Sequence, residues 1–254
     1  MSRGISEALI QLRAIAVFTW LYGWKAVERE PFWLASSLLM PISIIFIMTI
    51  FGGSRLMAFG MVGGLAMAMG TSGGLTVIGD AAFLRLELKF QSMLVNTKLN
   101  PATYTIGLAL SELTYSIPGL ALFAALVAVI VKPPPYAYAY GLLALILEWV
   151  SLSMMGYTIS TYITDARFGW SMSGILDFAL GTLPPVFYPA TLLPTPWLTL
   201  VSPISAASTV MQYYMLGVRY PQALIEASYL VLAIEALVFT TIAVKRSRWC
   251  GLPK

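Results

Sequence analysis

The feature that most constrains this chain is a series of long apolar blocks that are almost free of charge. Six blocks occur, at 32–51, 57–79, 102–131, 136–163, 171–193 and 223–244. A helix needs about 20 apolar residues to cross the hydrocarbon core of a bilayer. Charged residues make up only 10% of the chain, whereas they make up about a quarter of a soluble domain. The sequence therefore predicts an all-α integral membrane protein with six transmembrane helices and no separate soluble catalytic domain.

The first thirty residues predict a helix that lies along the membrane surface. Charged and polar residues, among them Glu7 and Gln11, share one face, while Leu12 and Trp20 lie away from it. The uncharged stretch from Ala14 to Trp24 is too short to span. It lacks the cleavage site of a signal peptide, so we expect 1–30 to stay in the mature protein as an interfacial helix.

The basic residues predict how the protein is oriented. With the N-terminus in the cytoplasm, twelve of the fifteen Lys and Arg residues fall inside, and only Arg55, Lys132 and Arg219 fall outside. We therefore expect a multi-pass protein of the cell membrane with both termini in the cytoplasm. The basic balance fits contact with anionic membrane lipids and does not call for nucleic-acid binding.

The segment 80–100 is the longest charged interruption between apolar blocks, and we expect it in the cytoplasm. At helical spacing Phe83, Leu86, Phe90 and Met93 form one apolar stripe, which predicts a short surface helix. Asp80 is the expected N-cap of this helix. Asn100 and Pro101 predict a second cap, with proline at the first position of the next helix.

The region before the last apolar block is apolar but interrupted by proline, which breaks a helix. Non-helical backbone at membrane depth persists only where protein covers it or where it lines a wet cavity. We therefore expect 194–219 to form a re-entrant segment near the outer face.

Four acids fall inside the predicted spans: Glu112, Glu148, Asp177 and Glu235. An ionised carboxylate in a membrane is costly, so each is a candidate for a functional role. Glu148, Asp177 and Glu235 either line a substrate path or serve as protonated or hydrogen-bonded acids that hold helices together. Proton coupling through Glu148 and Glu235 is a third interpretation.

Sequence signatures of catalysis are absent. The chain has no His, one Cys, no GxxxxGK[ST] phosphate loop and no GxSxG elbow. We therefore predict a non-enzymatic protein that binds no metal of its own and cannot hydrolyse ATP alone.

Two segments resemble ABC-2 type transporter permeases, the membrane subunits of ABC exporters. The first is Thr97 to Gly107, in which Pro101, Tyr104 and Gly107 are similar to the family's Pro, aromatic and Gly pattern, and Lys98 replaces a proline. The second comprises Tyr188-Pro189, Leu193-Pro194, Trp197-Leu198 and Ser202-Pro203-Ile204, and ends in Gln212.

The resemblance implies a homodimer, or a pair of related permeases, bound to two ATP-binding cassette subunits that supply the ATP and Mg²⁺ chemistry. By this resemblance, 80–100 is a coupling helix that sits in a cleft of the ATPase. We expect Arg85, Glu87 and Lys89 to make its polar contacts and Phe83, Leu86 and Phe90 to anchor it. The broken outer segment corresponds to an external gate, with these residues: Pro184, Pro185, Tyr188, Pro189, Pro194, Trp197 and Pro203.

The leading hypothesis is therefore the permease subunit of an ATP-driven exporter of a drug-like, lipid or glycan substrate. The alternative is a proton-coupled secondary transporter that uses Glu148 and Glu235.

Overall fold

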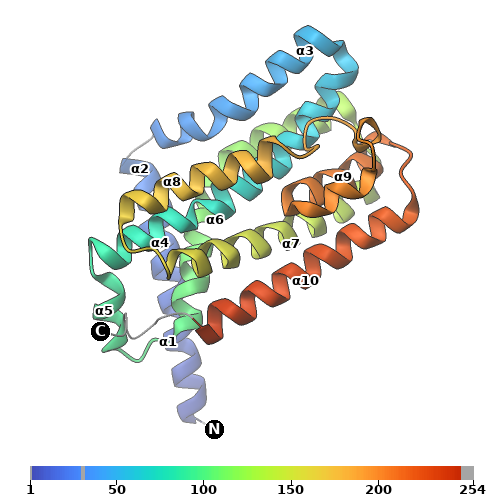
Figure 1. Cartoon of the computed structure of the whole chain (residues 1–254). Helices are drawn as coiled ribbons and strands as arrows, with labels where there is room; N and C mark the ends of the chain where they lie inside the picture. The colour runs from blue at the N-terminus through green and yellow to red at the C-terminus, as the bar shows by residue number, and fades with distance from the viewer. Residues whose placement is uncertain (1, 30–31, 247–254) are drawn as a thin grey trace.

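The computed structural model describes residues 2–29 and 32–246, and within these ranges the chain is helical with no strand. The helices pack into one bundle, whose long members lie side by side (Figure 1). The α-helices, in chain order, are α1 (Ser2–Phe18), α2 (Lys25–Arg29), α3 (Phe32–Met67), α4 (Val77–Leu86), α5 (Phe90–Val95), α6 (Pro101–Leu126), α7 (Pro135–Ser160), α8 (Ala166–Asp177), α9 (Pro203–Leu216) and α10 (Gln222–Arg246).

Short π-helical and 3₁₀ segments connect or extend these helices. The π-helical segments are η1 (Thr19–Trp24), η2 (Ala68–Leu75), η3 (Val127–Val131) and η4 (Phe178–Thr182). The 3₁₀ segments are η5 (Ala190–Leu192) and η6 (Pro196–Val201). Because η2 joins α3 to α4 without a reversal, the chain forms one long apolar run through this part of the bundle.

Four helical runs in the described ranges are long and apolar enough to cross a membrane. They are Leu56–Leu86, Pro101–Val131, Pro135–Ser160 and Gln222–Lys245. These four correspond to the second, third, fourth and sixth predicted spans. The protein is thus all-helical and of membrane type, as the apolar blocks predicted.

The blocks at 32–51 and 171–193 are not among these four runs. The first forms the arm of α3, which turns back on itself at Gly53, where φ is 63° (Figure 1). Glycine adopts this left-handed conformation without steric cost, so the expected link between the first two spans is reduced to a kink. The block at 171–193 is helical only to Thr182, because Pro184 and Pro185 follow and proline cannot continue the hydrogen-bonding ladder.

The predicted start of α6 is confirmed. Asn100 is the N-cap, and its Oδ1 accepts a hydrogen bond of 2.7 Å from the Thr103 amide, with Pro101 at the first helical position. The predicted cap at Asp80 is wrong, because Asp80 lies inside α4, which continues from η2. The apolar run therefore reaches Leu86 rather than ending at Gly79.

The segment 80–100 is not one surface helix. It consists of the end of α4, a break at Glu87–Lys89, the short helix α5 and a turn that leads into α6. Lys89 adopts a left-handed conformation with φ 50°, which redirects the chain between the two helices. As a result, Phe83 and Met93 do not share a single helical stripe.

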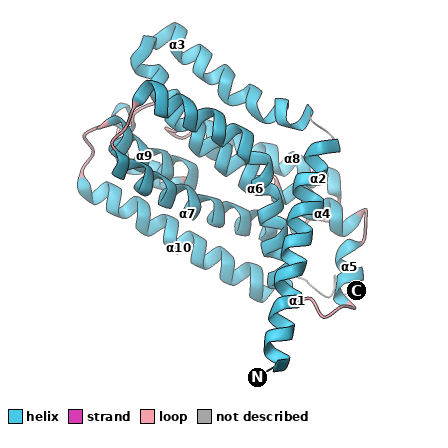
Figure 2. Ribbon diagram, turned by 180° about the vertical axis from the view of Figure 1, so that it is seen from behind, coloured by secondary structure: helices cyan, strands magenta, loops and turns pink. Residues whose placement is uncertain are grey.

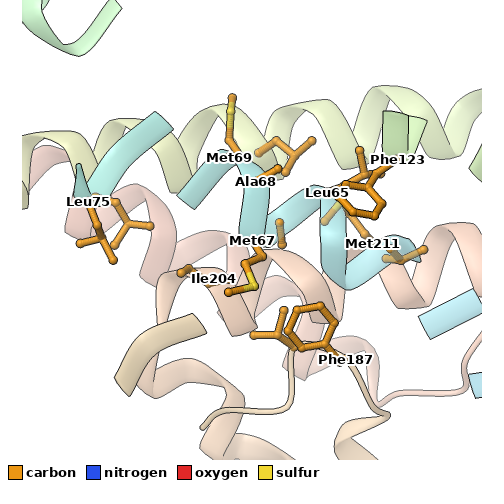
Figure 3. Packing of buried hydrophobic residues seen from close by; sticks show 14 of the residues in the cluster. Leu65, Met67, Ala68, Met69, Leu75, Phe123, Phe187, Ile204 and Met211 are labelled. Atoms are coloured by element: carbon orange, nitrogen blue, oxygen red, sulfur yellow. The ribbon is translucent and has the colours of Figure 1, made fainter. Parts of the chain in front are cut away.

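Glycines let the helices approach closely around η2. A Cβ atom on Gly64 would lie 2.8 Å from the Phe123 ring, and one on Gly74 would lie 2.8 Å from Leu152 Cβ. The small residues in this run therefore place η2 at the centre of the main apolar core, as the side chains in Figure 3 show.

The N-terminal helix runs across one end of the bundle rather than along it (Figures 1 and 2). Its inner side contacts α6: Phe18 packs on Gly107, and the Tyr115 hydroxyl donates to the Tyr22 carbonyl at 3.0 Å. Leu12 and Trp20 face outward and are more than half exposed. This arrangement fits the predicted helix at a membrane surface, with apolar side chains turned away from the bundle.

Candidate functional site

The corner between α4 and α5 is the first of three places where the sequence predicted functional residues. The corner lies at the same end of the bundle as α1 (Figure 1). Six of its residues were expected to contact a partner: Phe83, Arg85, Leu86, Glu87, Lys89 and Phe90. The structure separates them into exposed side chains and side chains that hold the corner together.

Arg85 belongs to the second group. Its guanidinium donates hydrogen bonds to the carbonyls of Thr161 at 2.6 Å, Ser160 at 2.7 Å and Ile163. These carbonyls lie at the end of α7 and in the turn that follows it, where a helix leaves carbonyls without partners of its own. A positive charge is also favourable at a helix C-terminus. Arg85 therefore fixes the end of α4 to the end of α7.

Phe90 also faces inward. Its ring lies 5.8 Å from that of Phe18, 5.4 Å from that of Tyr22 and 6.4 Å from that of Tyr104, measured between centroids. Leu94, one turn later, is also buried in this cluster. The six-residue helix α5 is too short to be stable alone, so this aromatic cluster against α1 and α6 holds it in place.

Gln11 secures the turn that follows α5. Its Nε2 donates to the Lys98 carbonyl at 2.8 Å, and its Oε1 accepts from the Thr103 hydroxyl at 2.6 Å. A helical projection placed Gln11 on the polar face of the first helix but gave no partner for it. The corner is thus attached to α1 as well as to α7.

The side chains that remain exposed at the corner are both charged and apolar. Glu87 and Lys89 are exposed, as are Phe83, Leu88 and Met93, the last by 62%. The predicted contact residues include the exposed Phe83, Glu87 and Lys89 but not the exposed Leu88 and Met93. The left-handed turn at Lys89 brings them to the surface, and a helical projection cannot anticipate such a turn.

The acidic residues inside the bundle are the second of the three places where the sequence predicted functional residues. Glu112 is buried, and its carboxyl group hydrogen-bonds to that of Asp80. Such a bond requires a proton on one of the two groups, so they act as a pair. Asp80 was predicted as a helix cap and not as the partner of Glu112.

Glu148 and Glu235 were grouped by prediction but differ in their surroundings. Glu235 is half-buried, and Ser151 Oγ donates to its Oε2 across a long 3.5 Å, which fits an acid that links α7 to α10. Glu148 is 0% exposed, and neither carboxyl oxygen has a hydrogen-bond partner. Asp177 Oδ1 is likewise buried without one. For Glu148, a role as a protonated acid that holds helices together and a role in a substrate path both stay predictions.

The proline-broken outer segment is the third of the three places where the sequence predicted functional residues. After η4 the chain leaves the bundle centre and then returns, because Ser202 Oγ donates to the Leu180 carbonyl at 2.6 Å. From there α9 runs outward, with Ile204 beside Gly70 and Met215 beside Gly141. That 194–219 re-enters the membrane near its outer face stays a prediction.

Gln212 on α9 organises the outer segment. Its Nε2 donates to the Val186 carbonyl at 3.2 Å, and its Oε1 accepts from the Tyr220 hydroxyl at 2.6 Å. The Ala190 amide donates to the same hydroxyl at 3.0 Å. Burial raises the pKa of Tyr220 to about 12, so it remains a neutral donor. The sequence prediction used Gln212 only as the end of a motif and gave it no role.

The predicted gate residues surround this network. Pro185 is buried, while Tyr188 and Pro189 are half-buried beside it. Pro194 and Trp197 are exposed on the outer turn, and Pro203 is the first residue of buried α9. The prolines thus shape the backbone, and the polar bonds come from α9 and Tyr220.

Comparison with known proteins gives no identification. No protein-family model matches the chain, and no curated protein is similar to it. The described residues also contain no group of three or more His, Cys, Asp or Glu side chains placed to hold a metal ion. The fold thus defines the class of the protein: over residues 2–29 and 32–246 it is helical, with four helices in these ranges long and apolar enough to cross a membrane.

Proposed function

We propose that this chain is the membrane permease subunit of an ATP-driven exporter in the cell membrane. A separate ATP-binding cassette protein hydrolyses ATP with Mg²⁺ and binds at the corner between α4 and α5. The termini face the cytoplasm, and two copies of the chain, or this chain and a related one, enclose the transport path. The sequence resemblance to ABC-2 permeases around Pro101 and Pro189 supports this assignment.

One observation carries the proposal: some side chains of the corner are exposed, while others hold the corner firmly to the bundle. Leu88, Lys89 and Met93 present a mixed apolar and charged surface, which is typical of a protein contact with apolar anchors and a polar rim. Arg85 and Phe90 hold the same corner against α7 and α1. A force on the exposed residues of the corner is therefore transmitted to the helix bundle, because the corner is not a loose loop.

The test changes the exposed side chains of the corner and keeps the side chains that hold the corner to the bundle. Lys89→Glu, combined with Leu88→Ala and Met93→Ala, changes the exposed surface and leaves Arg85 and Phe90 intact. We expect loss of ATP-driven export and of association with the cassette ATPase, with unchanged membrane insertion and melting temperature.

The matched control is Lys132→Glu. Lys132 is exposed and adopts the same left-handed conformation, with φ 52°, at the end of η3. It should leave export and association intact. If the triple variant exports at the wild-type rate, or if Lys132→Glu is equally defective, the corner is not the ATPase contact.

A second function has one observation in its favour. The shared proton of Asp80 and Glu112 is the kind of group that a proton-coupled secondary transporter uses. This pair is a better proton site than Glu148 with Glu235, which lack a comparable bond to each other. Transport by the purified chain alone, in liposomes with a pH gradient, would favour this function over the exporter.

A further inference from the structure

Several polar side chains in the described part of the chain have a buried atom without a hydrogen-bond partner. They belong to α7, to the run of α8 and η4, and to α9. Their atoms are Glu148 Oε1 and Oε2, Trp149 Nε1, Asp177 Oδ1, Thr182 Oγ1 and Ser205 Oγ. Buried polar atoms in proteins are nearly always bonded, so a group of exceptions calls for an explanation.

Contacts around Gly70 show that these elements meet. A Cβ atom on Gly70 would lie 2.5 Å from Glu148 Oε1 and 2.7 Å from Ile204 Cγ1. One on Gly181 would lie 3.5 Å from Ile204 Cδ1. Thr182 and Ser205 are the next residues along the chain from Gly181 and Ile204. Ile204 thus lies between the Glu148 carboxyl group and η4.

The contact of Glu148 and Ile204 at Gly70 lies near the middle of the long helices. Glu148 falls near the centre of Pro135–Ser160, and Gly70 falls near the centre of Leu56–Leu86. The surrounding side chains are apolar, and Figure 3 shows Ile204 beside Met67, with Phe187 next to them. A π-helical segment such as η2 at this point is also typical of functional sites.

The charges at this level are of one sign. Glu148 contributes a carboxyl group, while the sequence has no Lys or Arg from 99 to 131, from 133 to 166 or from 168 to 218. An unpaired carboxylate in such surroundings is costly. A ligand that brings a positive charge would remove this cost, whereas an anionic ligand would increase it.

We infer that the buried Glu148 carboxyl group, beside Gly70 and Ile204, binds an amphiphile with an ammonium group, and that Ile204 closes the site in this conformation. The ammonium pairs with the Glu148 carboxylate. The apolar part of the ligand replaces Ile204 against η2. This inference rests on the proposed exporter function and names its substrate class.

Ligand binding to the purified chain in phosphatidylcholine nanodiscs tests the inference without ATP or a partner. The probe is dansylcadaverine, which carries a primary ammonium, and its N-acetyl derivative is the neutral counterpart. We expect Glu148→Gln to weaken binding of the amine about tenfold, the factor that corresponds to the loss of about 1.4 kcal/mol, and to leave the neutral probe within about twofold. Ile204→Ala should strengthen binding of the amine.

The matched control is Glu226→Gln, which removes an exposed acid that accepts a bond from Gln222. It should bind the amine as the wild type does. The inference is overturned if Glu148→Gln, folded by its melting temperature, keeps the wild-type affinity, or if Glu226→Gln loses as much. It is also overturned if neither the wild type nor Ile204→Ala binds the amine in preference to its neutral counterpart.

Failure of this inference differs from failure of the exporter function. If Lys89→Glu, Leu88→Ala and Met93→Ala abolish ATP-driven export while Glu148→Gln binds the amine normally, the exporter function stands and the site is wrong. If the amine requires Glu148 and no ATP-dependent export occurs, the site stands and the exporter function is wrong.

Discussion

Arg85→Met tests whether this arginine stabilises the bundle or contacts a partner. The variant keeps an apolar stem but removes the guanidinium, which donates to the Ser160, Thr161 and Ile163 carbonyls at the end of α7. Hydrogen bonds from a charged donor contribute about 1.5–3 kcal/mol each. The freed carbonyls at a helix end regain part of this from water, so we expect a net loss of about 3 kcal/mol.

Thermal unfolding in detergent measures this loss. In a chain of about this size, 1 kcal/mol shifts the melting temperature by about 2–4 °C, so Arg85→Met should melt about 6–12 °C below the wild type. Lys89→Met, which removes an exposed cation four residues away, should shift it by less than about 2 °C. Wild-type melting of Arg85→Met would refute the stabilising role. If that variant also fails to bind the ATPase, Arg85 is a contact residue, as the sequence predicted.

Three further substitutions test local contacts through their effect on stability. Gln212→Leu removes the acceptor of the buried Tyr220 hydroxyl and one of the two donors to the Val186 carbonyl. We therefore expect about 1–3 kcal/mol of destabilisation and faster proteolysis between 186 and 201. Asn100→Ala removes the cap of α6 and should cost about 1 kcal/mol, measured by thermal unfolding against the matched exposed change Asn96→Ala. Lys89→Gly relieves a left-handed lysine and should raise stability by up to about 1 kcal/mol, and a lowered melting temperature would contradict this.

Element ends marked by local chemistry could be predicted from the sequence. Asn100 and Pro101 combine a side-chain acceptor with a residue that lacks an amide hydrogen, and α6 begins there. The limits of α10 likewise follow from composition. Asp80 misled the prediction because an acid after glycine fits a cap and equally fits a helix interior beside a second acid. Only the fold shows that Glu112 lies across from it.

Among the candidate functional residues, too, some features could be predicted from the sequence and others could not. Exposure of Lys89 was predictable because charge avoids the membrane. The inward direction of Arg85 was not, because its partners lie about 75 residues away at the end of another helix. Gln212 gave little signal for the same reason: a single polar residue in an apolar segment does not say which carbonyls it meets. Contacts between distant segments decided each of these roles.

The pattern of bonds around η2 determines where the proposed site opens. Ser153 Oγ donates to the Gly73 carbonyl at 3.2 Å, and Arg85 joins the far end of the same run to the end of α7. Hydrogen bonds thus join α7 to this run at two levels. The contact of Gly70 with Ile204, by contrast, is apolar packing. Displacement of Ile204 from Gly70 therefore breaks no side-chain hydrogen bond, which is what binding of a ligand at the Glu148 carboxyl group requires.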